Sequence, residues 1–176
     1  MAMAKRGTKM VPLVAAALAA LAGCSGTPGS RASSVKGVSA RLLQDDSAAY
    51  EAYRLVNEER RIRGLPDLVR RPELDRVAAR HARDQLWMGR LSHTGSDGSR
   101  LESRLSSLDW IWAGENLARN KGYGSPTREA VRGWIDSPRH RDNMFRPDFT
   151  HTGVASIRDP DTGFTYFVQI FIIPTA

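Results

Sequence analysis

The chain has 176 residues, of which 41% are hydrophobic, and it carries 26 basic residues against 19 acidic ones. This length allows one domain of ordinary size, whose core needs no disulfide bonds. Three of the basic residues, Lys5, Arg6 and Lys9, lie in an N-terminal segment that we expect to be removed, which leaves 23 against 19 and a net charge of about +4. So mild a balance does not indicate nucleic-acid binding.

The first 23 residues have the layout of a bacterial lipoprotein signal peptide. After the three basic residues, an apolar run spans residues 10–22, which is too short for a permanent membrane span. It ends in Leu-Ala-Gly-Cys at 21–24, which resembles a lipobox. We therefore predict an exported protein of the cell envelope, attached through a lipidated Cys24 to the outer face of the cell membrane or to an outer membrane. A small buried thiol is the alternative for Cys24.

Residues 24–44 are rich in Ser, Gly, Thr and Pro and are expected to form a flexible tether, so that the domain spans residues 45–176. A first helix is predicted from the acidic pair at 45–46 to just before Gly64. Its buried stripe comprises Ala49, Ala52, Tyr53 and Val56. The basic run Arg60, Arg61 and Arg63 is predicted to be a solvated face, with contact to anionic lipid or envelope polymer as the alternative.

A second helix is predicted from Pro72 to near Gly89. His81 lies beside its apolar face, where a histidine is more often a hydrogen-bonded core residue than a ligand. A glycine-rich polar loop at 91–98 follows and carries His93, and loops held by a rigid scaffold often carry function. A short helix is expected at 99–108.

The stretch 110–118 places the carboxylate of Glu115 among tryptophans and aliphatic residues. An ionised carboxylate buried there requires a cation, a protonated partner or several hydrogen bonds. The candidates that we consider for this partner are His93, His140 and His151.

A helix is predicted after Ser125-Pro126 that carries Trp134 on its apolar face. Pro138 interrupts it, because proline cannot donate a hydrogen bond to the preceding turn. Ser137 is expected to cap a new short helix, and His140 to tie the two helices together.

The C-terminal third reads as two strands, at 151–157 and 164–173, joined by a turn of Pro, Asp and Gly. The last strand is apolar on both faces, which is typical of a strand covered on both sides. The sequence therefore predicts an α/β fold in which helices cover both faces of a sheet, a three-layer α-β-α sandwich.

Two imidazoles, of His93 and His151, with the carboxylate of Glu115 make a plausible open Zn²⁺ site. Without a metal, Glu115 could instead hold one histidine in a fixed tautomer. The lone cysteine excludes a Cys-based zinc site, and neither a nucleotide-binding glycine loop nor an HExxH motif is present.

Four segments of this sequence carry a family resemblance: Leu91–Thr94, Ala113–Leu117, Trp134–Met144 and Phe149–Val154. In this order they resemble motifs of the CAP superfamily, which comprises cysteine-rich secretory proteins, antigen 5 and plant pathogenesis-related proteins. The likeness is closest to the bacterial, disulfide-free branch, and it covers residues 47–173.

This resemblance implies an α-β-α sandwich with a central, mainly antiparallel sheet and a cleft lined by two histidines and two glutamates that can bind a divalent cation such as Zn²⁺ or Mg²⁺. By motif, His93 resembles the first histidine, Glu115 the first glutamate and His151 the second histidine. The second glutamate would fall near Ser137, where the sequence has none, so the tetrad is incomplete. Residues expected to support the cleft are Asn116, Trp134, Ser137 and His140.

The expected function is a non-enzymatic, lipid-anchored module whose cleft binds a small ligand, a lipid, a glycan or an envelope partner. The alternative is a metal-assisted, peptidase-like hydrolase in which His93 and His151 hold the metal and Glu115 acts as general base. In a third interpretation, Glu115 and the histidines only hold loops to the sandwich.

Overall fold

The computed structural model describes residues 2–5 and 46–175. Cys24, the tether and most of the predicted signal peptide lie outside the described residues. In chain order the elements are β1 (Ala2–Lys5), α1 (Asp46–Ile62), β2 (Val69–Arg70), α2 (Pro72–Met88), α3 (Leu101–Arg104), β3 (Trp112–Asn120), α4 (Pro126–Asp136), α5 (Pro138–Met144), β4 (His151–Arg158) and β5 (Thr165–Ile173).

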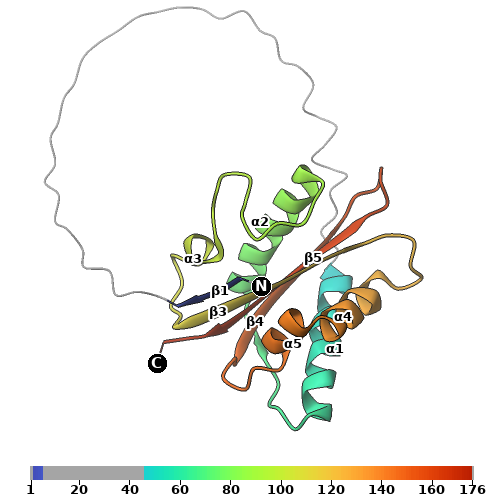
Figure 1. Ribbon diagram of the computed structural model, residues 1–176. Helices are drawn as coiled ribbons and strands as arrows, with labels where there is room; N and C mark the ends of the chain where they lie inside the picture. Colours follow the sequence, from blue (N-terminus) through green and yellow to red (C-terminus); the bar gives the residue numbers. More distant parts are fainter. Residues whose placement is uncertain (1, 6–45, 176) are drawn as a thin grey trace, which may run out of the picture.

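The strands form one five-stranded sheet in the order β1-β3-β5-β4-β2. The pairs β1·β3, β3·β5 and β4·β5 are antiparallel, and the two-residue β2 runs parallel to β4. The central place of β5 confirms the prediction made from its two apolar faces. Helices α2 and α3 cover one face of the sheet, and α1, α4 and α5 cover the other, which gives the expected three layers (Figure 1).

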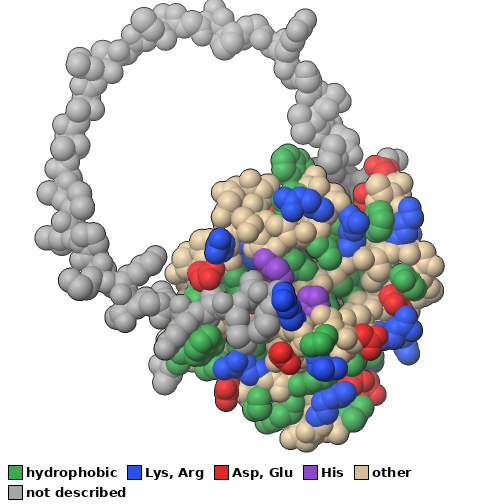
Figure 2. Space-filling model, viewed as in Figure 1, with side chains coloured by type: hydrophobic (Ala, Val, Ile, Leu, Met, Phe, Trp, Pro, Cys, Tyr) green, Lys and Arg blue, Asp and Glu red, His purple; other side chains and the backbone are tan. Residues whose placement is uncertain are grey.

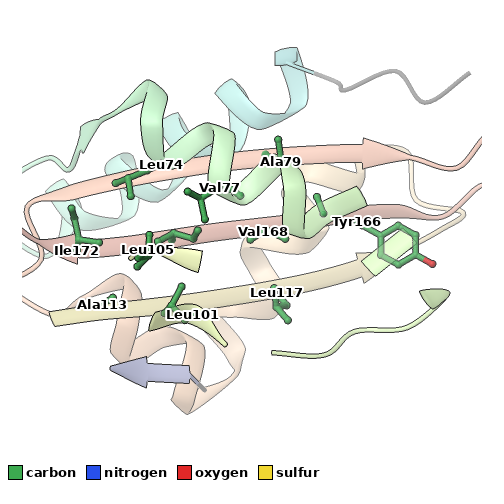
Figure 3. Close-up of a cluster of buried hydrophobic side chains, with 14 of the residues drawn as sticks. Leu74, Val77, Ala79, Leu101, Leu105, Ala113, Leu117, Tyr166, Val168 and Ile172 are labelled. Carbon is green, nitrogen blue, oxygen red and sulfur yellow. The ribbon is translucent and has the colours of Figure 1, made fainter. Parts of the chain in front are cut away.

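Each face of the sheet has its own hydrophobic core. Under α2 and α3, leucines such as Leu74, Leu101 and Leu105 pack on Val168 and Ile172 of β5 (Figure 3). Under α1, α4 and α5, the core is built around aromatic rings. Its largest members are Trp134, Phe149, Phe167 and Phe171.

Helix α2 approaches the sheet so closely that one strand position has no room for a side chain. A Cβ atom on Gly153 of β4 would lie 2.3 Å from the backbone carbonyl carbon of Leu74. Contact at that distance is impossible without moving backbone. Gly153 thus sets the depth at which α2 packs.

Most helix boundaries agree with those predicted. α2 ends at Gly89, whose φ of 64° is the left-handed conformation that favours glycine, and the Ser125 side chain accepts a hydrogen bond from Arg128 N–H at the start of α4. The break before Pro138 is also present. Ser137 is the N-cap residue of α5 and Pro138 begins that helix, as predicted, but the Ser137 side chain makes no capping hydrogen bond.

Two segments differ from the prediction. The stretch around Glu115, for which the sequence predicts neither a helix nor a strand, is a regular strand, β3, which lies within the sheet and is buried on both faces over most of its length. The helix expected at 99–108 is reduced to Leu101–Arg104, and the chain leaves the helical conformation at Leu105. Leu101 and Leu105 are buried nevertheless.

Arg60 is the clearest departure from the predicted solvated arginine face. Its side chain is fully buried and donates to four backbone carbonyls, those of Pro66, Met144, Arg146 and Phe149, at 2.7–3.2 Å. Arg60 thereby ties α1 to the segment between α5 and β4.

None of the helices between residues 46 and 175 combines the length and the hydrophobicity that crossing a membrane requires.

Candidate functional site

Glu115 is the buried charge at the centre of the candidate site. It lies in β3 opposite Ile170 of β5, and its side chain is 0% exposed. His93 Nδ1 lies 2.8 Å from Oε1, and Arg104 Nη2 lies 2.6 Å from Oε2. Each carboxylate oxygen therefore has a nitrogen partner, as burial of a charge requires.

The pKa of Glu115 lies below its ordinary value. Burial acts to raise that pKa, but the hydrogen bond from His93 and the positive charge of Arg104 outweigh it. Because an ionised carboxylate only accepts hydrogen bonds, His93 Nδ1 must carry the shared proton. In the neutral ring, Nε2 is then the acceptor atom, and the His93 side chain is 31% exposed.

Gln85 and His81 of α2 hold the loop that carries His93. Ser92 N–H donates to Gln85 Oε1 at 2.7 Å, and Gln85 Nε2 donates to the Ser92 carbonyl at 2.6 Å. His81 Nε2 lies 3.0 Å from that carbonyl and 3.7 Å from Glu115 Oε1, and burial lowers the pKa of His81. The structure thus places His81 as the hydrogen-bonded core residue that the sequence predicts.

His140 approaches the same place from the other side of the sheet. Asn116 directly follows Glu115 in β3, and its Nδ2 donates a hydrogen bond to the backbone carbonyl of His140 at 3.0 Å. Burial lowers the pKa of the half-buried His140 ring. Asn116 thus holds the start of α5 beside the strand position next to Glu115. Histidine side chains reach the surface at neighbouring places on one face of the molecule (Figure 2).

The remaining predicted support residues fix α4 and α5 to β3. Asn143 Nδ2 donates to Asn116 Oδ1 at 2.9 Å, and Trp134 Nε1 donates to the carbonyl of Leu117 at 3.0 Å. All of these polar groups are buried. Ser137 contributes backbone only, through a hydrogen bond from its N–H to the Gly133 carbonyl.

His151 is not brought to Glu115. Its Nε2 lies 3.2 Å from Arg71 Nη2 and its Nδ1 lies 2.8 Å from Thr150 Oγ1, at the start of β4. Burial and the charge of Arg71 lower the pKa of His151. The structure therefore joins His93 and Glu115 and places the third predicted residue in a separate cluster.

A divalent metal does not fit the donor set around Glu115. One carboxylate oxygen already bonds the Arg104 guanidinium, whose positive charge would repel a cation, and His151 is engaged elsewhere. Within residues 46–175, no group of three or more His, Cys, Asp and Glu side chains is arranged to hold a metal ion. The tetrad inferred from the resemblance is thus not assembled here as a metal site.

Two cavities adjoin the network of hydrogen bonds and ion pairs around Glu115. One, of about 290 Å³, lies against β3 and α4 and is lined in part by Leu91, Tyr123, Trp134 and His140. Another, of about 440 Å³, is polar: its lining combines His81 and Arg104 with serines and aspartates. The network therefore borders space on more than one side.

Arg104 is the functional residue that sequence reasoning missed. Only histidines were considered as partners of Glu115, although a guanidinium satisfies a buried carboxylate more completely. The available signal was a basic residue between Leu101 and Leu105, which the helical pattern places next to a buried stripe.

Residues 53–171 match the model of the family described as "CAP: Cysteine-rich secretory protein family". This match spans more than half of the chain. The chain belongs to the CAP family. The order of the four motifs and the three layers are consistent with this membership.

Among curated proteins, this CAP chain is similar to two from Bacillus subtilis (strain 168). It is 33% identical over 114 residues to the uncharacterized protein YkwD, covering 62% of this chain and 43% of YkwD. It is 35% identical over 98 residues to the uncharacterized membrane protein YlbC, covering 54% of this chain and 26% of YlbC. The chain thus matches less than half the length of these relatives.

Solved structures show the same fold. An outer surface protein from Borrelia burgdorferi superposes with a TM-score of 0.68 at 20% identity, covering 76% of this chain and 98% of that one. An extracellular protein containing an SCP domain from Bacillus anthracis superposes with a TM-score of 0.64 at 28% identity, covering 72% of this chain and 40% of that one.

Proposed function

We propose that this CAP domain is a binding module whose recognition groups are His93 and His140 at the outer edge of β3. The observation that carries the proposal is the His93–Glu115 hydrogen bond of 2.8 Å, in which the carboxylate is fully buried and the imidazole is partly exposed. Glu115 fixes the tautomer and orientation of a ring that meets the solvent. Arrangements of this kind serve recognition as well as catalysis.

The surroundings suit a ligand that has both an apolar part and hydrogen-bonding groups. The 290 Å³ cavity beside His140 combines the exposed Leu91 and Tyr123 with the polar side chains of Asn120 and Glu129. His93 Nε2 can accept one hydrogen bond from such a ligand or, when protonated, donate one. Small ligand sites are typically mixed in this way.

Binding is tested by imidazole NMR on ¹³C,¹⁵N-labelled protein titrated with soluble peptidoglycan fragments, short-chain phospholipids and peptides. We expect one of these classes to shift the His93 and His140 ring signals, and His93→Ala to abolish its binding. His151→Ala is the matched control and should bind normally. If none of the three classes shifts the rings, or if His93→Ala binds as well as the parent, the proposal is wrong.

A hydrolase is the second candidate, because the His93–Glu115 pair also has the arrangement of a base and its orienting acid. Glu115 itself cannot be the general base, since both of its oxygens are bonded and its side chain is 0% exposed. His93 would take that role through Nε2. Turnover of peptide, ester or peptidoglycan substrates that disappears in His93→Gln would favour this candidate over simple binding.

We also propose that the chain is exported and lipid-anchored through Cys24. The supports are the lipobox ending at Cys24 and the likeness to an extracellular SCP-domain protein from Bacillus anthracis. We expect the mature protein to fractionate with membranes and to carry a diacylglycerol mass on its N-terminal cysteine. Cys24→Ser should remain uncleaved and lack the lipid. A variant that is cleaved and carries the same lipid mass as the parent protein would contradict the proposal.

A further inference from the structure

The outer face of α2 carries a line of exposed basic side chains that ends in an aromatic ring. Arg76, Arg80 and Arg83 are exposed, and Trp87 is 76% exposed. At about 100° per residue, these four positions lie within about 60° of one another around the helix. Together they form the α2 stripe. Residues on the other side of α2, such as Val77, are buried against the sheet (Figure 3). The α2 stripe therefore faces away from the sheet.

The arginines of the α2 stripe form no ion pair with any acidic residue that the structure describes. The acidic residues of α2 itself bind elsewhere. Glu73 and Asp75 pair with arginines that precede the helix, at 3.4 and 3.0 Å. Asp84 accepts a hydrogen bond from the Ser96 backbone N–H at 2.9 Å. The positive charge of the stripe is thus not neutralised within the described part of the chain and is available to an anionic partner.

Trp87 indicates what kind of anionic partner this is. Of the four tryptophans, Trp110 and Trp134 are 2% and 1% exposed and Trp112 is half-buried, so Trp87 alone is open to solvent. An indole ring has an apolar body and one N–H donor, which suits the boundary between water and lipid acyl chains. Arginines beside such a ring are typical of surfaces that lie on anionic lipid headgroups. A soluble anionic polymer would need the arginines only.

The predicted tether would hold α2 within reach of a membrane. As the flexible chain that its composition predicts, the stretch at 24–44 would span roughly 25 Å on average. That reach allows any face of the domain to meet the surface, so the tether does not select one. It does keep the domain at a high effective concentration near the lipid. A modest attraction is then enough to orient the domain.

We propose that the α2 stripe docks on the anionic lipid surface of the membrane, with its arginines on headgroup phosphates and Trp87 at the interface. The proposal rests on the proposed lipid anchor and concerns a surface other than the binding site at His93. In this orientation, the layer of α1, α4 and α5 faces away from the membrane (Figure 1).

This surface replaces the lipid contact considered for the arginines at 60–63. Arg60 is buried, and Arg61 and Arg63 form ion pairs with Asp67 and Glu59, at 2.7 and 2.5 Å. Their charge is largely satisfied within the protein, whereas that of the α2 stripe is not.

The test measures whether Trp87 touches lipid when the protein is held at a vesicle. The processed protein, purified from membranes, is reconstituted into vesicles of phosphatidylglycerol and phosphatidylcholine whose acyl chains are brominated, because bromine quenches indole fluorescence at short range. Trp87→Phe identifies the signal of Trp87, since the other three tryptophans are buried or half-buried. Vesicles of brominated phosphatidylcholine alone test the need for anionic lipid.

Two variants of equal net charge test the arginines. One removes the charge of the α2 stripe through Arg76→Gln, Arg80→Gln and Arg83→Gln. The matched control removes three exposed arginines from α1 and α5, in the opposite layer, through Arg54→Gln, Arg139→Gln and Arg141→Gln. A difference between the two variants therefore reports the position of the charges and not their number.

We expect Trp87 to be quenched in anionic vesicles, both in the parent protein and in the control variant. An arginine near an anionic surface is worth about fivefold in the equilibrium constant, so the stripe variant should dock about 100-fold less and lose the quenching. Neutral vesicles and high salt should also weaken it. Absence of quenching in the parent protein, or equal quenching in the two variants, would overturn the proposal.

The outcomes separate this proposal from those made above. If the protein carries no lipid on Cys24, the anchor is wrong, and the unprocessed full chain, held at vesicles by its apolar run at 10–22, decides the docking surface by the same quenching. If the stripe variant loses binding to soluble polyphosphate while Trp87 of the parent protein is not quenched, the face binds an anionic polymer and the membrane proposal is wrong. Ligand binding at His93 is measured separately, so either proposal can fail while the other stands.

Discussion

Two buried charges lie on opposite faces of the sheet, and the protein accommodates them in different ways. Arg60, under the layer of α1, α4 and α5, donates only to backbone carbonyls and is fully buried. Glu115, under α2 and α3, is paired with Arg104 and with His93, whose side chain is 31% exposed. Backbone carbonyls surround the charge of Arg60, whereas the charge of Glu115 contacts the ring of His93, which reaches the surface.

This difference indicates what each charge does. Carbonyls of Pro66 and of the segment at 144–149 cannot change their protonation, so Arg60 can only hold that segment to α1. The His93 ring is partly exposed and can meet a ligand, so the hydrogen bond that Glu115 accepts from it is linked to events outside the core. We therefore assign a structural role to Arg60 and a functional one to the Glu115 network.

The largest effect is expected for Arg60→Met, which leaves four buried carbonyls without a donor. We expect a loss of about 4 kcal/mol in the free energy of unfolding, measured by urea denaturation. Arg61→Met is the matched control, because the neighbouring Arg61 forms an exposed ion pair with Asp67 and should cost about 0.5 kcal/mol or less. Equal losses in the two variants would show that the buried Arg60 contributes no more to stability than the exposed Arg61.

Glu115→Gln should cost about 3 kcal/mol, because it keeps the shape but leaves the nearly buried Arg104 without its counter-charge. Unlike Arg60→Met, it should also weaken ligand binding, since the amide can no longer hold the tautomer of His93. Urea denaturation and the imidazole titration described above measure the two effects. Loss of stability with unchanged affinity would make Glu115 purely structural.

The Glu115 network should make stability depend on pH. The folded pKa of Glu115 lies below its ordinary value of 4.5, so its contribution is present above pH 4.5 and is lost as the pH falls through the folded pKa. The folded pKa of His81 lies below 6.5, so stability also declines as the pH falls below 6.5 and the unfolded state takes up a proton. Urea midpoints between pH 3 and 8 measure both.

In Glu115→Gln, the decline below pH 4.5 should become shallower, whereas Arg60→Met should keep the slope of the parent protein. If the stability of Glu115→Gln falls with pH as steeply as that of the parent protein, the Glu115 carboxylate is not the cause of the loss of stability at acid pH.

The smallest effect is expected for His151→Ala. Its ring is half-buried and bonds Arg71 and Thr150, both near the surface, so the free energy of unfolding should change by about 0.5 kcal/mol or less. Ligand affinity should be unchanged. A loss of affinity as large as that of His93→Ala would return His151 to the recognition site.

Much of the architecture could be predicted from local sequence signals. The apolar stripes and caps of α1, α2 and α4 and the two apolar faces of β5 act through near neighbours in the chain, and they gave the three layers and the central strand. β3 was not predicted, because its burial on both faces depends on helices from distant segments.

The sequence by itself determined the family motifs, the sandwich and the requirement that Glu115 find a partner, because these depend on residue type and short-range periodicity. Only the tertiary structure decided which partners it found: Arg104 and His93 rather than His151, with His140 brought near from α5. It also decided that Arg60 is buried while Arg61 is not. The physical reason is that a charge pairs with whatever the packed layers place within a few ångströms, and separation along the chain does not specify that distance.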